Sequence, residues 1–278
     1  MSNNKSEFNR NNLKDNFLKQ VLFRIDYNGI VDITPIISAF NNEFKPKIDS
    51  YETTFHNRID LDLQSLEDIS ETLAVPVKVL EKQTIHRYAL KTSGNSDVTL
   101  DISRFYTTLT VKCKDYTIID EYMKFLNDFI LFMFKENNFF EIKRVGLRKL
   151  GEIVVANYND LFSVFEKDVF CSNAALNDLY STSMLNNLSV IRPNGKDETV
   201  NYNRRIQEGY VTDVDGKESK AYQAVLDMDC FLKDDSLDSV NESNNAADIL
   251  NNMNNILFDV YLLSVTYDYL KGKKKEDE

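Results

Sequence analysis

The sequence predicts an α+β fold in which two similarly ordered halves form a mostly antiparallel sheet with two long amphipathic helices packed on it. Two observations lead to this prediction. Each half contains several segments with the alternation typical of strands, followed by one long segment with apolar residues at helical spacing. The chain has 278 residues, which is enough for two such halves to share one core. The order of elements repeats, although no residue-level repeat is visible.

The first α+β half is predicted to span residues 17–155. Strands are expected at residues 18–27, 77–91, 98–103, 106–112 and 139–155, and helices at residues 34–44 and 115–137. Residues 47–75 are left open: weak alternation allows a strand at 55–63, and one short helix could span 65–73. Thr34 is the expected N-cap of the first helix, because Pro35 directly after it fits the first helical turn. The long helix at 115–137 has an apolar stripe wide enough to predict burial on more than one side.

The second α+β half is predicted to span residues 156–270 and to share the core of the first. A short helix is expected at 174–185, a turn at 193–195, a hairpin at 199–211 and 220–232 with its turn at 213–216, a mobile acidic loop at 233–246 and a final helix at 247–270. The polar segment 1–16 and the charged tail 271–278 are predicted to be disordered.

Composition predicts a cytoplasmic protein without a membrane partner. The 44 acidic and 33 basic residues give a net charge of −11, which disfavours broad binding to nucleic acid or to an anionic membrane. No apolar run approaches the roughly 20 residues of a membrane span, and the N-terminus lacks the apolar core of a signal peptide. The three cysteines are widely spaced and are expected to be reduced thiols.

The strand at 139–155 places charged side chains where a partner is needed. Arg144 and Arg148 fall on one face of it, and an unpaired buried guanidinium is costly. In the late strand, Asp227 and Asp229 likewise share one face. The sequence allows two interpretations: a solvated polar face, or Arg148 and Arg144 pairing with Asp227 or Asp229 across strands. If the residues pair across strands, we expect all four to have a structural role first and a binding role second.

Catalytic and metal motifs are missing from the sequence, so a non-catalytic protein without a cofactor is favoured. Asp227 and Asp229 could hold Mg²⁺ through their oxygens, but short acidic patterns arise by chance in acidic chains, and no metal site is predicted. His56 and His86 are the only histidines, and no Cys-x-x-Cys or His-x-x-x-His spacing exists. No Walker A loop, G-x-G-x-x-G or G-x-S-x-G motif is present.

An RNA-binding sheet is the alternative function, supported by basic and aromatic residues in the strands between residues 77 and 112. The candidate contacts are Lys82, Arg87, Tyr88, Arg104 and Tyr106. Aromatic and basic residues on a sheet are typical of RNA-binding folds built from ferredoxin-like halves. A mixed polar sheet face is the competing interpretation, and the acidic total favours it.

The order of elements and two strand motifs resemble those of a sporadically distributed family of uncharacterised bacterial and archaeal proteins of about this length. The motifs are R-V-G-L-R at 144–148 and L-D-M-D at 226–229. They are similar to the family's central R-x-G-L-R-[YF]-I-N-R-I-like strand and late L-D-I-D-like strand. Lys149, Leu150 and Gly151 depart from the central pattern, with Gly151 in the place of the family's Asn.

The resemblance implies no established activity, and its patchy distribution suggests mobile or defence-associated loci. The expected function is a non-catalytic cytoplasmic interaction or adaptor protein in a mobile defence or toxin–antitoxin-like system. The expected partner is another protein, with homodimer formation as a further possibility. On this match Arg148, Asp227 and Asp229 are the first positions to test.

Overall fold

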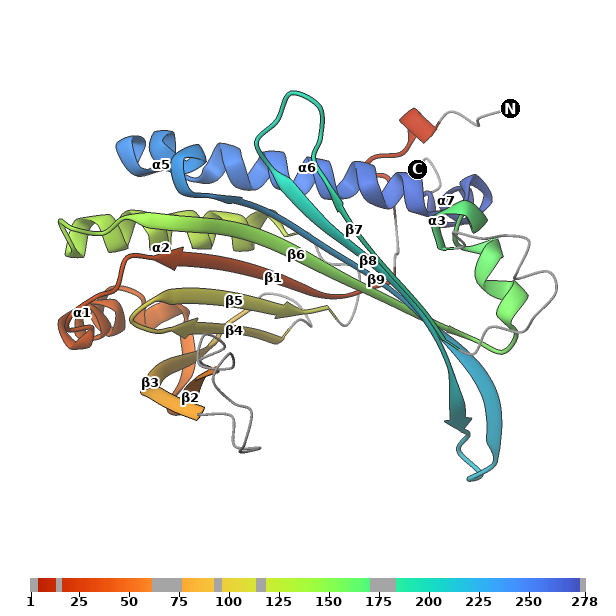
Figure 1. The fold of residues 1–278 in the computed structure, drawn as a ribbon, viewed down its shortest axis with the longest axis horizontal. Helices are drawn as coiled ribbons and strands as arrows, with labels where there is room; N and C mark the ends of the chain where they lie inside the picture. Colours follow the sequence, from red (N-terminus) through yellow and green to blue (C-terminus); the bar gives the residue numbers. More distant parts are fainter. Residues whose placement is uncertain are drawn as a thin grey trace, which may run out of the picture.

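The computed structural model of the chain describes six stretches of backbone. They are residues 5–13, 17–61, 77–92, 97–113, 119–170 and 184–275, with the side chains of 56–61 and 77–82 not described. Within them the fold is α+β, as the sequence predicts, with one large antiparallel sheet and two long helices on one of its faces (Figure 1).

The strands follow the alternating segments of the sequence. They are β1 (Leu18–Tyr27), β2 (Ile48–Leu61), β3 (Val77–Leu90), β4 (Asp97–Ile102), β5 (Tyr106–Lys112), β6 (Ile142–Val155), β7 (Met184–Ile191), β8 (Thr199–Thr212) and β9 (Glu218–Lys233). β1 and β5 agree with prediction at both ends, because period-2 alternation bounded by turn residues is a strong strand signal.

The helices include two long ones, α2 (Asp120–Glu136) and α6 (Ala247–Ser264). The shorter helices are α1 (Thr34–Glu43), α3 (Lys167–Phe170), α5 (Asp238–Ser243) and α7 (Tyr267–Lys273), and 3₁₀ turns lie at η1 (Lys5–Glu7), η2 (Lys45–Lys47), η4 (Tyr158–Ser163) and η5 (Asp234–Leu237).

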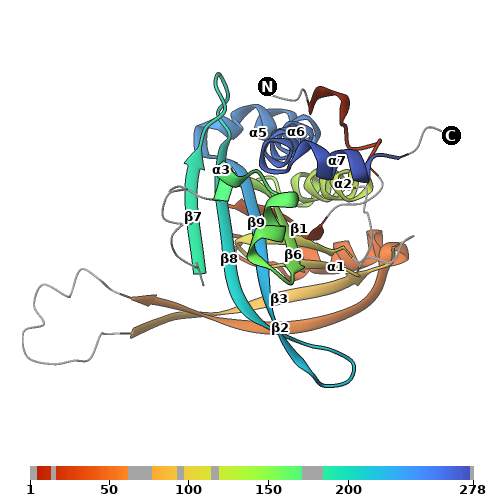
Figure 2. The same ribbon diagram turned by 90° about the vertical axis from the view of Figure 1, so that its right-hand side faces the viewer.

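β6 joins the early and late parts of the chain into one sheet. The strand order is β2-β3-β4-β5-β1-β6-β9-β8-β7, and every neighbouring pair is antiparallel. Leu147 of β6 pairs with Phe23 of β1 on one side and with Cys230 of β9 on the other. The sheet twists strongly, and α2 and α6 lie together on the same face (Figure 2).

The core lies between the sheet and these helices and is continuous across both parts of the chain. Alternate residues of β1, namely Val21, Phe23 and Ile25, are fully buried against the helices. From α2, Phe129 is fully buried and packs edge-on against Phe40 of α1. Buried residues of β6, β9 and α6 belong to the same cluster, so the described chain has one hydrophobic core.

Residues 5–13 are ordered, which corrects the prediction of a disordered segment 1–16. Phe8 and Leu13 are buried, and the Lys5 ammonium donates to the carbonyl oxygens of Leu262 and Val265 at the end of α6. Two apolar anchors in a polar segment give enough buried surface to fix it against a neighbouring helix. Residues 1–4 and 14–16 lie outside the described chain.

The C-terminal tail is also ordered where it is described, up to residue 275. Lys274 forms an ion pair with Glu7 at 3.1 Å, and the Lys275 amide donates to the Asn12 carbonyl oxygen at 2.8 Å. The predicted disorder of 271–278 is therefore wrong for residues 271–275, because the N-terminal segment supplies partners that the sequence pattern of the tail cannot show.

The segment 233–246, predicted to be a mobile loop, forms η5 and α5. Leu237 and Val240 within it are buried and anchor it to the core. The final helix, predicted as one element, divides into α6 and α7. Val265 adopts an extended conformation and bridges to Phe165, and the Thr266 side chain caps α7 by accepting from the Tyr269 amide.

Three local predictions also change. Thr34 is inside α1 rather than its N-cap, and its amide donates to the Asp32 carboxylate at 2.9 Å. β2 begins at Ile48, earlier than the strand that the sequence allowed from 55. Residues 184 and 185 begin β7, which the sequence did not predict, so the helix expected at 174–185 is wrong at its end. The rest of that helix, and the helix at 65–73, lie outside the described residues.

Position 151 in β6 requires a glycine, because the ring of Phe17 leaves no room for a Cβ atom. An added Cβ would lie 2.5 and 2.6 Å from two ring atoms of Phe17, closer than real Cβ contacts come. We predict that Gly151→Ala lowers the free energy of unfolding by about 1–3 kcal/mol, as overpacking typically does. Urea unfolding monitored by circular dichroism measures it.

Gly209→Ala provides the matched control, because Gly209 also lies in a strand and an added Cβ there meets nothing within 4 Å. It should change the unfolding free energy by less than about 1 kcal/mol. Equal effects of the two substitutions would show that the contact with Phe17 does not constrain position 151.

Candidate functional site

The arginines and aspartates singled out in the sequence form a continuous row across β6 and β9. Arg148 donates two hydrogen bonds to Asp227, from Nε at 2.7 Å and from Nη2 at 2.6 Å. Arg144 donates to Asp229 at 3.1 Å and lies over the ring of Phe231 at 4.9 Å. These side chains lie on the face of the sheet away from α2 and α6, called here the outer face.

The Arg148–Asp227 pair joins the strand of the first half to the strand of the second. The Asp227 side chain is only 14% exposed, whereas that of Arg148 is 48% exposed. A bidentate guanidinium–carboxylate pair fixes geometry as well as charge. Burial raises the pKa of Asp229, and this effect outweighs the lowering by Arg144 and Arg148.

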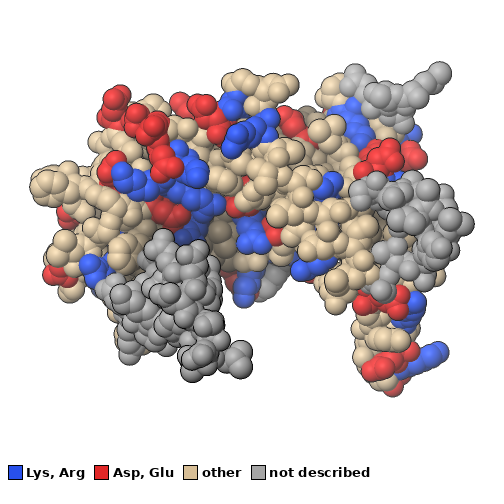
Figure 3. Space-filling model, in the orientation of Figure 1, with Lys and Arg blue, Asp and Glu red and all other residues tan. Residues whose placement is uncertain are grey.

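The row continues over the rest of the outer face. Arg144 also approaches Asp26 at 3.7 Å, and Asp26 accepts from Arg24 at 2.7 Å. On β3 and β4, Arg87 makes two hydrogen bonds to Asp101, at 2.8 and 2.9 Å. Each of these arginines therefore meets a carboxylate, and Figure 3 shows basic and acidic side chains next to one another rather than in separate patches.

The residues proposed as RNA contacts are divided among different surroundings. Arg87 and Tyr106 lie on the outer face, where the guanidinium of Arg24 stacks 4.6 Å from the Tyr106 ring centroid. Tyr88 is fully buried and packs against Phe40, because alternate strand residues point to opposite faces.

The other two RNA candidates lie away from that face or outside the description. Arg104 follows β4 and donates to the Ile30 carbonyl oxygen at 2.7 Å. The side chain of Lys82 lies outside the described residues. The five candidates therefore do not form one described surface.

Among the described residues, no group of three or more histidine, cysteine or acidic side chains is arranged so that it could hold a metal ion. His86 stacks on Tyr51, whose hydroxyl lies 2.9 Å from the His86 Nδ1 atom, and burial lowers the pKa of this histidine. Cys113 and Cys230 are buried cysteines, while Cys171 and the side chain of His56 lie outside the described residues.

Lys149 is a buried charged group that the sequence analysis missed. It lies on the core side of β6 with 9% of its surface exposed, and its ammonium donates to the Oδ1 atom of Asn254 on α6. Its pKa is lowered to about 7, first by burial and then by the positive charge of Arg10, while Cys113 and Asp120 act in the opposite direction. The sequence did indicate this burial, because residues 145, 147 and 149 alternate along the strand, so Lys149 lies on the same face as the apolar Val145 and Leu147.

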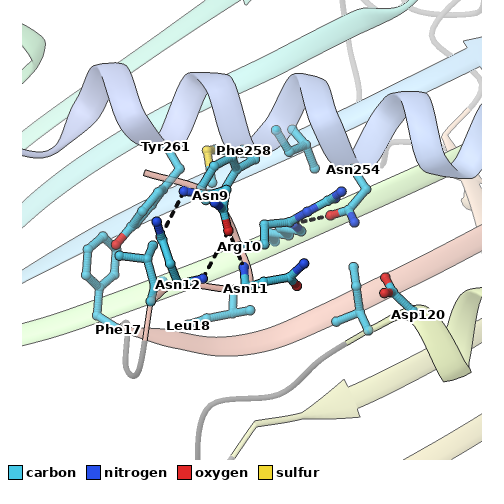
Figure 4. Close-up of a pocket in the computed structure, with 16 residues that line it drawn as sticks. Asn9, Arg10, Asn11, Asn12, Phe17, Leu18, Asp120, Asn254, Phe258 and Tyr261 are labelled. Carbon is cyan, nitrogen blue, oxygen red and sulfur yellow. Dashed lines mark hydrogen bonds between the residues drawn. The ribbon is translucent and has the colours of Figure 1, made fainter. Parts of the chain in front are cut away.

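A cavity of 520 Å³ opens at Lys149, between β6, α6 and the N-terminal segment (Figure 4). Figure 4 shows Phe17, Tyr261 and Phe258 toward one end and Asn254 and Asp120 toward the other. Asn254 is fully buried, and its Nδ2 atom has no hydrogen-bond partner among the described residues. An unsatisfied buried donor of this kind costs about 1–3 kcal/mol, so the cavity is a second candidate site.

The third feature is β7, the last strand of the sheet order. Its sequence, M-L-N-N-L-S-V-I, has no charged residue and no proline. Met184, Leu188 and Val190 alternate along it and are 69%, 66% and 61% exposed. Within the described chain β7 pairs only with β8, so the backbone donors and acceptors of its other edge have no described strand partner.

A search against protein-family models and curated proteins gives no match to this chain. Among the described residues, no helix combines the length and the apolar character needed to cross a membrane.

A double-mutant cycle should detect the pair between Arg148 and Asp227. We predict that Arg148→Met and Asp227→Asn are coupled by about 1 kcal/mol in unfolding free energy, because the pair is bidentate but its arginine is half exposed. The control cycle is Lys143 with Glu141, an ion pair whose side chains are 48% and 50% exposed. Coupling no larger than in the control would mean that the first pair does not stabilise the sheet.

Lys149 should make stability depend on pH. Because its pKa is about 7 when folded and near 10.5 when unfolded, unfolding takes up a proton between these values, and the unfolding free energy rises with pH across that window. Lys149→Met should therefore stabilise the protein most below about pH 7, and its advantage should shrink by at least about 1 kcal/mol between about pH 6 and about pH 9.5.

Urea unfolding at both pH values gives this difference. Lys143→Met, at an exposed lysine of the same strand, is the control and should give a constant difference. A constant difference for Lys149→Met as well would contradict burial of the amine.

Proposed function

We propose that this protein is a non-catalytic interaction protein, an adaptor or subunit that acts in the cytoplasm and binds another protein through the outer edge of β7, which pairs with no further strand among the described residues. The observation that carries the proposal is the uncharged edge strand with exposed Met184, Leu188 and Val190. Natural sheets usually protect such edges with charges, proline or a covering element, because an open edge pairs with other chains. The family resemblance suggests a mobile defence or toxin–antitoxin-like system as the setting.

The expected partner presents an extended segment that adds a strand to the sheet. Backbone hydrogen bonds along the edge would supply affinity, and apolar side chains of the partner would cover Leu188 and Val190. On β8, Asn203 pairs with Leu188 and Asn201 pairs with Val190, and these two asparagines provide a polar rim.

RNA binding is the alternative function, and its specific support is the stacking of Arg24 on Tyr106. The charges of the outer face favour the protein partner instead. Arg87, Arg144 and Arg148 already donate to carboxylates. Phosphate contacts would have to compete with these hydrogen bonds, and counterion release, which drives nucleic-acid binding, needs free positive charge. A filter-binding assay showing salt-sensitive RNA affinity would favour the alternative.

Site-specific photo-cross-linking in cells of the native host tests the interaction. A photoreactive residue at Leu188 should give one discrete adduct with another protein, because that side chain would lie in the interface. The control position is Leu263 on α6, which is 70% exposed and should give none. The double substitution Leu188→Lys and Val190→Lys should abolish recovery of the partner, whereas Leu263→Lys should not.

Two results would overturn the proposal. One is equal cross-linking at positions 188 and 263, which would show that the β7 edge is not selective. The other is an adduct of the protein with itself alone, which would make β7 a contact between two copies rather than an adaptor surface.

A further inference from the structure

The cavity beside Lys149 has the size and composition of a small-molecule site. Its volume of 520 Å³ lies within the roughly 300–1,000 Å³ typical of ligand pockets. Three parts of the chain that are distant in sequence form it: the N-terminal segment with Arg10, strand β6 with Lys149, and helix α6 with Asn254. Figure 4 shows these elements around one space.

The polar end of the cavity presents hydrogen-bond donors. The ammonium of Lys149 donates to Asn254 Oδ1, which leaves the Asn254 Nδ2 group without a partner among the described residues. Arg10 also lines the cavity and donates to Asn255 at 2.9 Å. Asp120 is the acidic residue of the lining, so two basic groups face one acidic group and the lining has a formal charge of +1.

Lys149 has no ion pair with a described carboxylate, although its amine is buried. A buried cation without an anionic partner is strongly unfavourable unless it loses its proton. A ligand that brings a carboxylate would pair with the ammonium and would accept from the Asn254 Nδ2 group. One anionic head group would thus satisfy both buried groups.

The rest of the lining combines apolar and aromatic side chains with three asparagines of the N-terminal segment, Asn9, Asn11 and Asn12. Phe17, Phe258 and Tyr261 lie toward the end away from Asn254. Leu257 and Met228 also line the cavity, and Met228 pairs with Lys149 between β6 and β9. Phe17 and Tyr261 pack against one another with ring centroids 5.5 Å apart. The aromatic part of the lining favours a hydrocarbon or aromatic body, because burying apolar surface contributes about 25 cal/mol per Å².

We propose that this cavity binds a small monocarboxylic acid with an apolar body, such as a medium-chain fatty acid, with its carboxylate on Lys149 and Asn254 and its chain between Phe17 and Phe258. This site is independent of the β7 edge, because it lies on the helix-covered side of the sheet. The protein would therefore bind a small acid as well as a protein partner, and either property can fail without the other.

Calorimetric titration of the purified full chain with decanoate tests the site. Decanol and decylamine are matched probes that keep the chain and change only the head group. Decanoate should bind at one site, and decanol and decylamine should bind at least about tenfold more weakly. Above about pH 7.5 decanoate binding should also take up a proton, seen as a dependence of the heat on the buffer's ionisation enthalpy, because the ligand charges Lys149.

Three variants locate the site. Lys149→Met and Asn254→Leu should each weaken decanoate binding by at least about tenfold, and Lys143→Met on the same strand should not. The chain has no tryptophan, so Phe258→Trp supplies a single tryptophan, in the cavity, whose selectively excited fluorescence decanoate should perturb, even if the other variants fail to fold.

Equal affinity for decanoate and decanol would overturn the proposal, as would unchanged decanoate binding by folded Lys149→Met. No fluorescence change of the Phe258→Trp variant at saturating decanoate would also overturn it.

Discussion

The antiparallel pairing of β6 with β1 on one side and with β9 on the other is the constraint on which the structure depends. It brings the strands from the start of the chain and those from its end into one sheet. Because side chains alternate along a strand, this single pairing also fixes which residues face α2 and α6 and which face outward. The core, the charged row and the cavity all follow from that register.

The register of β6 places structural ion pairs on one face of the strand and the candidate ligand-binding lysine on the other. Outward, Arg148 and Arg144 meet Asp227 and Asp229, so charges that would be unfavourable alone become part of the sheet. Inward, Lys149 has the same parity as Val145 and Leu147 and is carried into the core beside Asn254. The first arrangement satisfies its charges within the chain, whereas the second leaves a donor available.

The N-terminal segment gains its structure from elements at the other end of the sequence. Lys5 binds the last carbonyl groups of α6, and Glu7 pairs with Lys274. By packing there, residues 9–13 become one wall of the cavity. A polar segment that would be disordered alone is thus ordered by the helix it covers, and the cavity exists only because the two chain ends meet.

The sequence by itself determined the fold class, most strands and the long helices, because alternation and helical spacing are local constraints. It named Arg148 and the late-strand aspartates as candidates for a pair, since an unpaired buried guanidinium is costly, but it left a solvated polar face as the other interpretation. Only the tertiary structure decided the rest: the order of residues 5–13 and 271–275, the break at Val265, the edge strand β7 and the meeting of Lys149 with Asn254. The physical reason is that each depends on partners far away in the sequence, whose positions no local pattern specifies.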